Sequence, residues 1–210
     1  MESKHHIPVV FIGLLIITEL SRSEDDAQKS TDNSEVDIRK FLEEGKPILT
    51  HWTSNNKLIC RVDAFEQITD DSASVKRYEK KTSDKTGRNQ RRVKPITLRA
   101  QFTTSARAYE TPVKFDTMVL TYPDGQRYAV ETIHHQNEDC TVFEVSLRRS
   151  GSTTNPTIYV EVRVKSPWKE ETIERCLQAA NSITHRYKLP PLRKITDQPC
   201  LSKVQSALKE

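Results

Sequence analysis

The sequence lacks long apolar segments and the short motifs of common enzymes. Its one sustained apolar run, from Ile7 to Ile17, is too short to cross a bilayer as a helix, and no later segment comes near the required length. No C-x-x-C pair or Cys/His cluster indicates zinc. G-x-S-x-G, H-E-x-x-H and paired-carboxylate patterns are also missing. The sequence therefore predicts a binding protein rather than an enzyme, with no metal, no cofactor and no membrane-spanning helix.

The N-terminal residues have the pattern of a cleaved secretory signal. Lys4 and two histidines precede the apolar run, and small residues at Ser21 and Ser23 follow it. We therefore expect a secreted, extracellular protein. The next ten residues are acidic and polar with little to bury, which is typical of a flexible leader. The expected division is a signal peptide at 1–23, a flexible leader at 24–33, one domain at 34–200 and a C-terminal tail at 201–210.

The four cysteines all follow the predicted signal. An even count of cysteines in a secreted chain indicates disulfides, here two bonds with three possible pairings. The residues concerned are Cys60, Cys140, Cys176 and Cys200.

Apolar residues between positions 46 and 165 recur with a period close to two, which predicts β-strands. Turn-favouring residues such as Pro123, Asp124 and Gly125 separate them. Short connections without helical patterns between strands favour an all-β, eight-stranded antiparallel up-and-down barrel, and a two-sheet sandwich is the alternative. The predicted strands are 46–53, 57–68, 72–81, 92–104, 112–121, 126–135, 140–148 and 156–165.

Two helices are predicted to flank the strands. A short N-terminal helix should begin at a Ser34 cap and end before Gly45. After the last strand, Ser166 and Pro167 have the residue types of an N-cap and a first helical position, and this helix should run to about Ile183. Its apolar stripe predicts a C-terminal α-helix packed on the barrel wall.

Four segments of the chain resemble the tick salivary lipocalins, the histamine-binding protein family. They are DIRKFLEEGKPILTHW at 37–52, the L-x-C-x-V-D pattern around Cys60, CTVFEV at 140–145 and YVEVRVKS at 159–166. The resemblance extends over most of the chain and implies an eight-stranded barrel with a C-terminal helix on its wall. The G-x-W signature of ordinary lipocalins is absent.

The resemblance also implies how the cysteines pair. It joins the seventh strand to the C-terminal helix as Cys140–Cys176, and the second strand to the tail as Cys60–Cys200. Residues from 189 onward are predicted to be extended, because the ring of each proline in Pro190-Pro191 disfavours helix in the residue before it. Cys200 is then the one firm anchor expected for the tail.

Amine-binding members of the family carry Cys-Asp-Val on one strand and Glu-aliphatic-Trp on the next. Here Thr141 takes the place of the aspartate, Glu161 is kept, and Arg163 takes the place of the tryptophan. An arginine beside the remaining carboxylate pairs with it and repels an ammonium group. The departures from the family pattern therefore argue against amine binding at this site.

Residues two apart on a strand share a face, which groups the pocket candidates. The wall around them is largely apolar and carries the cation of Arg163, so an apolar ligand with an acid group is favoured. The alternative is that Glu161 and Arg163 form a buried pair with only a structural role. The candidates are Thr141, Phe143, Tyr159, Glu161 and Arg163.

Residues 76–94 form a basic run. Nine basic residues stand against Glu79 and Asp84, a local net charge of +7. Such a run favours contact with anionic glycans or acidic protein surfaces, and a solvated hairpin tip is the alternative. The basic surface candidates are Lys76, Arg77, Lys80, Lys81, Arg88, Arg91 and Arg92.

The expected function follows from the family resemblance. It is a secreted, monomeric salivary lipocalin that sequesters a small host mediator, a biogenic amine or preferably an acidic lipid, to suppress host defence. The alternative is a protein- or glycan-binding modulator that acts through the basic run and has a filled barrel. Neither nucleic acid nor a membrane is an expected partner.

Overall fold

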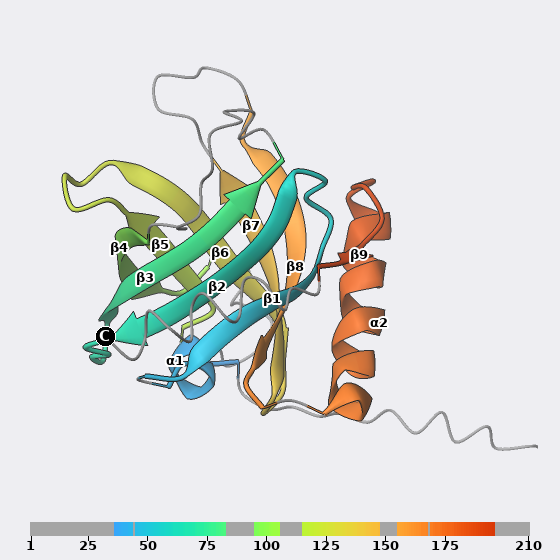
Figure 1. Ribbon diagram of the computed structural model, residues 1–210, viewed down its shortest axis with the longest axis horizontal. Helices are drawn as coiled ribbons and strands as arrows, with labels where there is room; N and C mark the ends of the chain where they lie inside the picture. The colour runs from blue at the N-terminus through green and yellow to red at the C-terminus, as the bar shows by residue number, and fades with distance from the viewer. Residues whose placement is uncertain are drawn as a thin grey trace, which may run out of the picture. The chain divides into compact units, whose positions relative to one another are not determined.

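The computed structural model shows a closed antiparallel barrel (Figure 1). Each strand from β1 to β8 pairs with the next one in sequence, and β1 also pairs with β8, which closes the sheet. The strands are β1 (Pro47–Thr53), β2 (Leu58–Glu66), β3 (Ser72–Lys81), β4 (Ile96–Thr103), β5 (Thr117–Thr121), β6 (Arg127–Gln136), β7 (Cys140–Leu147) and β8 (Thr157–Lys165). The structure describes residues 36–43, 45–82, 95–105, 115–147, 155–167 and 169–195.

The predicted all-β up-and-down barrel is confirmed, and the sandwich alternative is wrong. A two-sheet sandwich would leave edge strands, whereas β1 has a partner on both sides. Each predicted strand overlaps one observed strand. Two predicted starts, at 92 and 112, lie outside the described residues, and β4 and β5 begin later, at Ile96 and Thr117.

The period of two in the sequence separates the inner and outer faces of the barrel. On β7, Val142 packs outward against α2 (Glu170–Arg186). Phe143 packs inward among the buried apolar side chains of the barrel interior, which include Phe65, Leu98 and Met118 and which we call the lumen cluster. The same alternation holds on β8, where Val162 faces out and Tyr159 faces in. Both faces of these strands are therefore buried, which explains why they are rich in large apolar residues.

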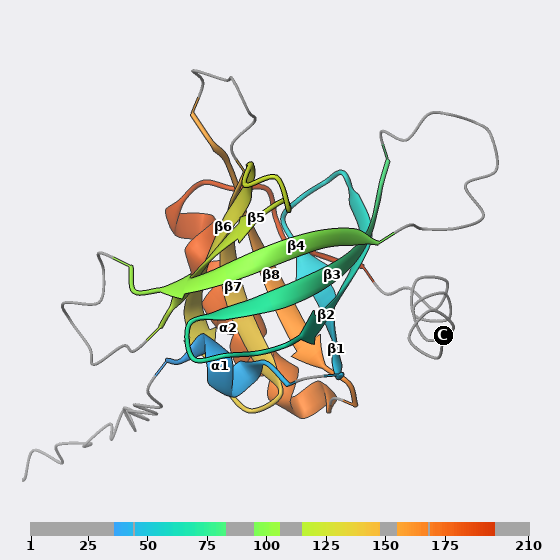
Figure 2. The same cartoon turned by 90° about the vertical axis from the view of Figure 1, so that its left-hand side faces the viewer.

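Helix α1 (Ile38–Phe41) lies across one end of the barrel (Figure 2). Asp37 is its N-cap, because the Asp37 carboxylate accepts a hydrogen bond from the Arg39 backbone N–H at 3.0 Å. The predicted cap, Ser34, lies outside the described residues. Ile38 and Phe41 are fully buried and join the lumen cluster, so α1 closes this end with apolar side chains.

Helix α2 packs on the outer wall against β7 and β8, as predicted (Figure 1). It begins at Glu170, so the prediction of Ser166 and Pro167 as its first residues was wrong. Strand β8 is still held by a hydrogen bond from Lys165 N to Asp139 O at 3.0 Å, and the chain must turn before a helix can start. The helix ends at Arg186, and no helix among the described residues has the length and apolar character needed to span a membrane.

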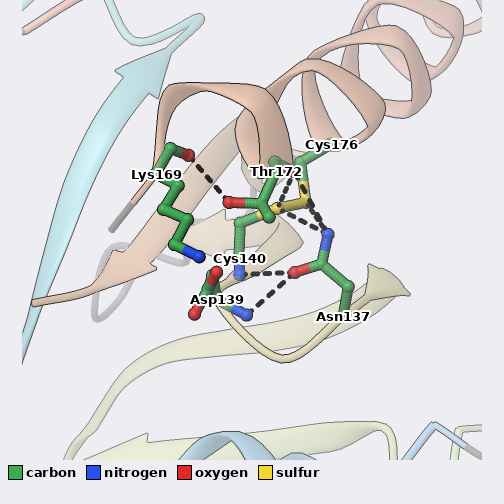
Figure 3. The surroundings of a disulfide bond; sticks show 6 residues. All are labelled: Asn137, Asp139, Cys140, Lys169, Thr172 and Cys176. Carbon is green, nitrogen blue, oxygen red and sulfur yellow. Dashed lines mark hydrogen bonds between the residues drawn. A yellow bond between two sulfur atoms is a disulfide. The ribbon is translucent and has the colours of Figure 1, made fainter. Parts of the chain in front are cut away.

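A disulfide joins α2 to β7 (Figure 3). The predicted Cys140–Cys176 pairing is confirmed, with the two Cα atoms 6.5 Å apart. The Asn137 amide oxygen accepts from the Cys140 backbone N–H at 2.7 Å, and its nitrogen donates to the Thr172 carbonyl at 3.3 Å. This side chain therefore ties the start of β7 to the first turn of α2. Cys60 is also disulfide-bonded, and its predicted partner, Cys200, lies outside the described residues.

A short strand that the sequence did not predict holds the chain after α2. Strand β9 (Arg193–Lys194) pairs with β1, and the Ile195 N–H donates to the His51 carbonyl at 2.9 Å. Ile195 is only 6% exposed. The expectation that Cys200 alone anchors this segment was wrong, because backbone pairing and an apolar contact hold it upstream of that cysteine.

Candidate ligand site inside the barrel

The structure places all five predicted pocket residues inside the barrel. They come from adjacent strands, and the register sets Thr141 opposite Arg163 and Phe143 opposite Glu161. None is more than 2% exposed. The period of two had predicted that the members on each strand share a face, and the structure agrees. Their role as ligand contacts stays a prediction.

Glu161 and Arg163 form the buried pair that the sequence analysis raised as an alternative. The Arg163 Nε and Nη2 atoms donate to one oxygen of Glu161 at 2.9 and 2.6 Å. Its third nitrogen, Nη1, donates to Glu131 at 2.5 Å, and its guanidinium carbon lies 4.4 Å from the centre of the Phe143 ring. Every nitrogen of this guanidinium therefore already donates a hydrogen bond to a carboxylate of the protein.

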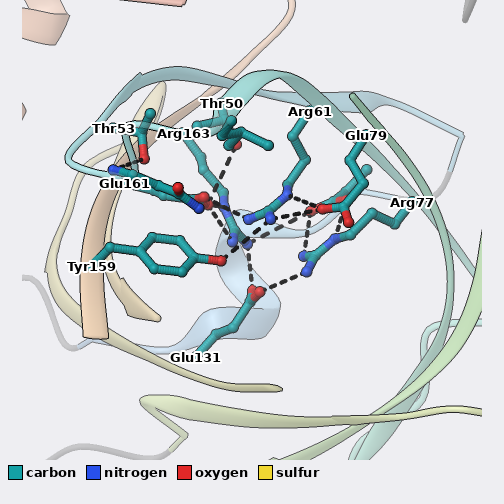
Figure 4. Close-up of polar contacts among 12 residues, drawn as sticks. Thr50, Thr53, Arg61, Arg77, Glu79, Glu131, Tyr159, Glu161 and Arg163 are labelled. Atoms are coloured by element: carbon teal, nitrogen blue, oxygen red, sulfur yellow. Dashed lines mark hydrogen bonds and ion pairs between the residues drawn. The ribbon is translucent and has the colours of Figure 1, made fainter. Parts of the chain in front are cut away.

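Arg163 belongs to a larger group of charged side chains inside the barrel (Figure 4). Most of these residues were not among the predicted pocket residues. The sequence carries a signal for them on β2 and β3, where Arg61 and Asp63, and Arg77 and Glu79, each stand two apart with an apolar residue between them. The basic run on β3 was instead predicted to lie on the surface. We call this group the lumen charge cluster. It contains four cations, Arg61, Arg77, Lys81 and Arg163, and four carboxylates, Asp63, Glu79, Glu131 and Glu161.

Arg77 and Arg61 connect the cluster across the barrel. Arg77 donates to both oxygens of Asp63, at 2.7 and 2.8 Å, and to Glu131 at 2.9 Å. Arg61 donates to Glu161 at 2.5 Å and to Glu79 at 2.8 Å. The Arg77–Asp63 and Arg61–Glu79 contacts join direct partners of the adjacent strands β2 and β3. The Arg77–Glu131 and Arg61–Glu161 contacts join strands far apart in the sequence, so they exist only because the sheet closes. Two-nitrogen contacts of this kind fix side-chain orientation as well as charge.

Neighbouring cations keep Glu79 and Glu131 ionised despite their burial. Burial raises the pKa of Glu79, but Arg61 and Lys81 outweigh it and lower the pKa to about 2. Burial likewise opposes ionisation of Glu131, and the charges of Arg163 and Arg77 bring its pKa well below the usual range. Glu79 and Glu131 are therefore ionised at neutral pH.

Part of the cluster lies near the barrel end opposite α1. We call this end the mouth; it carries the β1–β2 turn at 54–57 and the β5–β6 turn at 122–126. Strand β3 runs away from α1 and ends at Lys81 (Figure 1). Lys81 donates to Glu79 at 2.6 Å, and its side chain is 31% exposed. Solvent therefore reaches the cluster at the mouth, while its central members are 0–1% exposed.

Two hydroxyl groups inside the barrel lack a hydrogen-bond partner among the described residues: those of Thr141 and Tyr128. Tyr128 is 9% exposed, packs in the lumen cluster, and lies with its ring centre 5.4 Å from the Arg77 guanidinium carbon. By contrast, the Tyr159 hydroxyl accepts from Arg61 at 3.3 Å. Buried hydroxyls usually have a partner, so these two are the polar positions that a ligand or water could satisfy.

The basic run is less basic on the surface than its sequence indicates. Arg77 was predicted to lie on that surface, and this was wrong. Its side chain points into the lumen, where it is fully buried and forms an ion pair with Asp63. Lys76 is exposed but pairs with Glu66 at 2.8 Å. Lys80 is exposed and has no ion pair within the described part of the chain. The remaining candidates, Arg88, Arg91 and Arg92, lie outside the described residues.

No cluster of three or more His, Cys, Asp or Glu side chains in the described ranges is arranged to hold a metal ion. The carboxylates of the lumen charge cluster already bind arginine and lysine nitrogens. The described interior therefore combines charged groups that pair with one another and apolar side chains.

Comparison with solved structures shows that this barrel has the fold of lipocalins. The siderocalin Ex-FABP matches with a TM-score of 0.50 and 9% identity, over 74% of this chain and 94% of that one. Insecticyanin from the tobacco hornworm Manduca sexta matches with a TM-score of 0.50 and 11% identity, over 79% and 84%. Japanin from Rhipicephalus appendiculatus, a tick lipocalin in a structure bound to cholesterol, matches with a TM-score of 0.42 and 11% identity, over 75% and 96%.

The protein therefore has the lipocalin fold. At these identities the structural similarity establishes the fold alone. No model of a known protein family matches the sequence, and no curated protein matches it significantly.

Proposed function

We propose that this chain is a secreted lipocalin that sequesters a small, mainly apolar molecule inside its barrel. The observation that carries the proposal is the pair of buried hydroxyls, on Thr141 and Tyr128, that face a lumen of apolar side chains without a protein partner. A mainly apolar site with a few precisely placed polar groups is the usual form of a small-molecule site. Thr141 lies opposite Gln136 at the α1 end of the lumen, and Tyr128 lies at the start of β6 near the mouth, so the two hydroxyls mark opposite ends of the lumen.

The sequestered molecule is proposed to be a mediator of host haemostasis or inflammation, and the protein to act in saliva as a monomer. This part of the proposal rests on the resemblance to the tick salivary lipocalins. The Cys140–Cys176 disulfide supports an extracellular location, because such bonds persist in oxidising compartments.

The contacts of Arg163 remove the reason for preferring an acidic ligand. The sequence favoured an acidic lipid because it placed the cation of Arg163 in a largely apolar wall. Its three nitrogens instead donate to Glu161 and Glu131. An incoming acid would have to displace one of these carboxylates, so Arg163 no longer favours an acid group over other polar groups.

Native mass spectrometry of the protein secreted from eukaryotic cells tests the proposal. We expect a bound small molecule that organic extraction removes, and one binding site for the fluorescent probe N-phenyl-1-naphthylamine on the extracted protein. The Thr141→Val variant should bind the co-purified molecule more weakly. Thr97→Val, at an exposed position on β4, is the matched control and should bind normally. Absence of both a bound molecule and probe binding would refute lumen binding.

A second candidate is a modulator that binds proteins or anionic glycans through the basic run. It is favoured by the finding that charged side chains occupy the centre of the lumen. Binding to heparin would then weaken steeply as salt rises, whereas a ligand inside the barrel would be held with little change. Isothermal titration of both ligands across a salt series separates the two functions.

A further inference from the structure

We propose that the ligand of this barrel is uncharged: a mainly apolar molecule whose polar group is a hydroxyl or a carbonyl, not a carboxylate or an ammonium. The inference rests on the proposed function, since it presumes that a small molecule enters the lumen. The expectation of an amine or an acidic lipid considered single residues such as Arg163, whereas an uncharged ligand follows from the lumen charge cluster as a whole.

The lumen charge cluster is electrically balanced. Four cations face four carboxylates, and each charge has an opposite partner at 2.5 to 2.9 Å. Seven of the eight groups have side chains no more than 8% exposed. A charged ligand would therefore add an uncompensated charge to a place where desolvation makes such a charge costly.

The arginines of the cluster have no spare nitrogen for a charged ligand. Each nitrogen of Arg77 and of Arg163 already donates to a carboxylate. Both oxygens of Asp63 accept from Arg77, and both oxygens of Glu131 accept from arginines. A ligand ion would have to break one of these pairs and leave a buried protein charge unpaired, which opposes its binding.

An uncharged polar group has a natural partner in Tyr128. Its hydroxyl is buried in the lumen and has no hydrogen-bond partner in the described part of the chain. Burial raises the pKa of Tyr128, so the phenol is neutral at physiological pH. A phenol both donates and accepts, so it can bond to a ligand hydroxyl or carbonyl without a change in net charge.

Three probes with the same chain and different head groups test the inference directly. Decanol, decanoic acid and decylamine are titrated at pH 7 and 0.15 M salt by displacement of N-phenyl-1-naphthylamine. We expect decanol to bind at least tenfold more tightly than either charged probe. Equal or tighter binding of decanoate or decylammonium would overturn the inference while leaving small-molecule binding intact. Failure of all three, and of the fluorescent probe itself, would overturn the proposed function as well.

Two variants at the mouth shift the charge balance in opposite directions. Glu79→Gln leaves the cluster with a net charge of +1, and Lys81→Gln leaves it at −1. Decanoate should gain at least tenfold in affinity relative to decanol in the first variant, and decylammonium should gain similarly in the second. The Lys81 side chain is 31% exposed and that of Glu79 is 8% exposed, so thermal melting is used to verify that both variants fold.

Glu144→Gln is the matched control for these variants. Glu144 lies on the outer face of β7, where its carboxylate contacts His134 at 2.9 Å, so the same change in charge occurs outside the lumen. This variant should keep the ligand order of the unaltered protein. If Glu79→Gln and Lys81→Gln also keep that order, charge balance does not select the ligand and the inference is wrong. If either variant fails to fold, the three-probe comparison on the unaltered protein still decides.

Discussion

Glu131 accepts hydrogen bonds from two arginines that have almost no access to water. Glu131→Gln should therefore markedly lower the free energy of unfolding. The bonds come from Arg77 at 2.9 Å and Arg163 at 2.5 Å, and all three side chains are 0–1% exposed. Removing one partner of a buried ion pair costs about 3–5 kcal/mol. Arg77 keeps Asp63 and Arg163 keeps Glu161, so we expect the lower part of that range, about 3 kcal/mol.

Urea unfolding followed by circular dichroism measures the loss. A fall of about 3 kcal/mol is a large share of the roughly 5–15 kcal/mol that stabilises a typical domain, so the midpoint should drop clearly while the slope stays the same. Glu144→Gln, at a pair on the outer face, should lose less than about 1 kcal/mol.

A double variant separates charge balance from simple loss of contacts. Glu131→Gln combined with Arg163→Met removes one charge of each sign from the cluster and leaves three of each. We expect it to be more stable than the sum of the two single losses predicts, by about 2 kcal/mol. The reasoning would be refuted if Glu131→Gln unfolded within about 0.5 kcal/mol of the unaltered protein, or if the double variant showed simple additivity.

Three further predictions concern the disulfide, pH and amines. The bond between Cys140 and Cys176 closes a separation of 36 residues, so its selective removal by Cys→Ala changes should lower the free energy of unfolding by roughly 4 kcal/mol in urea titrations, less any relief of strain. The folded-state pKa of Glu79 lies below its unfolded value of 4.5, so its contribution, roughly 3 kcal/mol, is present above pH 4.5 and should be lost as pH falls toward 2 in acid titrations of stability. Histamine and serotonin should show no tight binding by calorimetry, whereas Thr141→Asp with Arg163→Trp should improve amine binding because it adds a carboxylate and removes a cation; no gain would mean that the lumen has no room for an amine.

The sequence predicted which residues of β7 and β8 share a face, because that prediction needed only the local geometry of a strand. The period of two on β7 and β8 places Thr141 with Phe143 and Glu161 with Arg163 whichever way the barrel closes. The pairing of Glu161 with Arg163 was one of two predicted alternatives. It could be predicted because the two residues are only two positions apart on β8. The predicted start of α2 was wrong because it depended on how the chain turns at the end of β8. Strand β9 was not predicted because it depends on how the chain runs beyond Pro190-Pro191.

By itself, the sequence determined an alternating-strand domain with a flanking helix and an even number of cysteines, because strand period, turn residues and cysteine count are local properties. Only the tertiary structure decided that Arg77 lies in the lumen and not on the basic surface. Its partners Asp63 and Glu131 are 14 and 54 residues away along the chain. Alternation shows which residues share a face, but closure of the sheet decides which face is the interior and which charges meet across it.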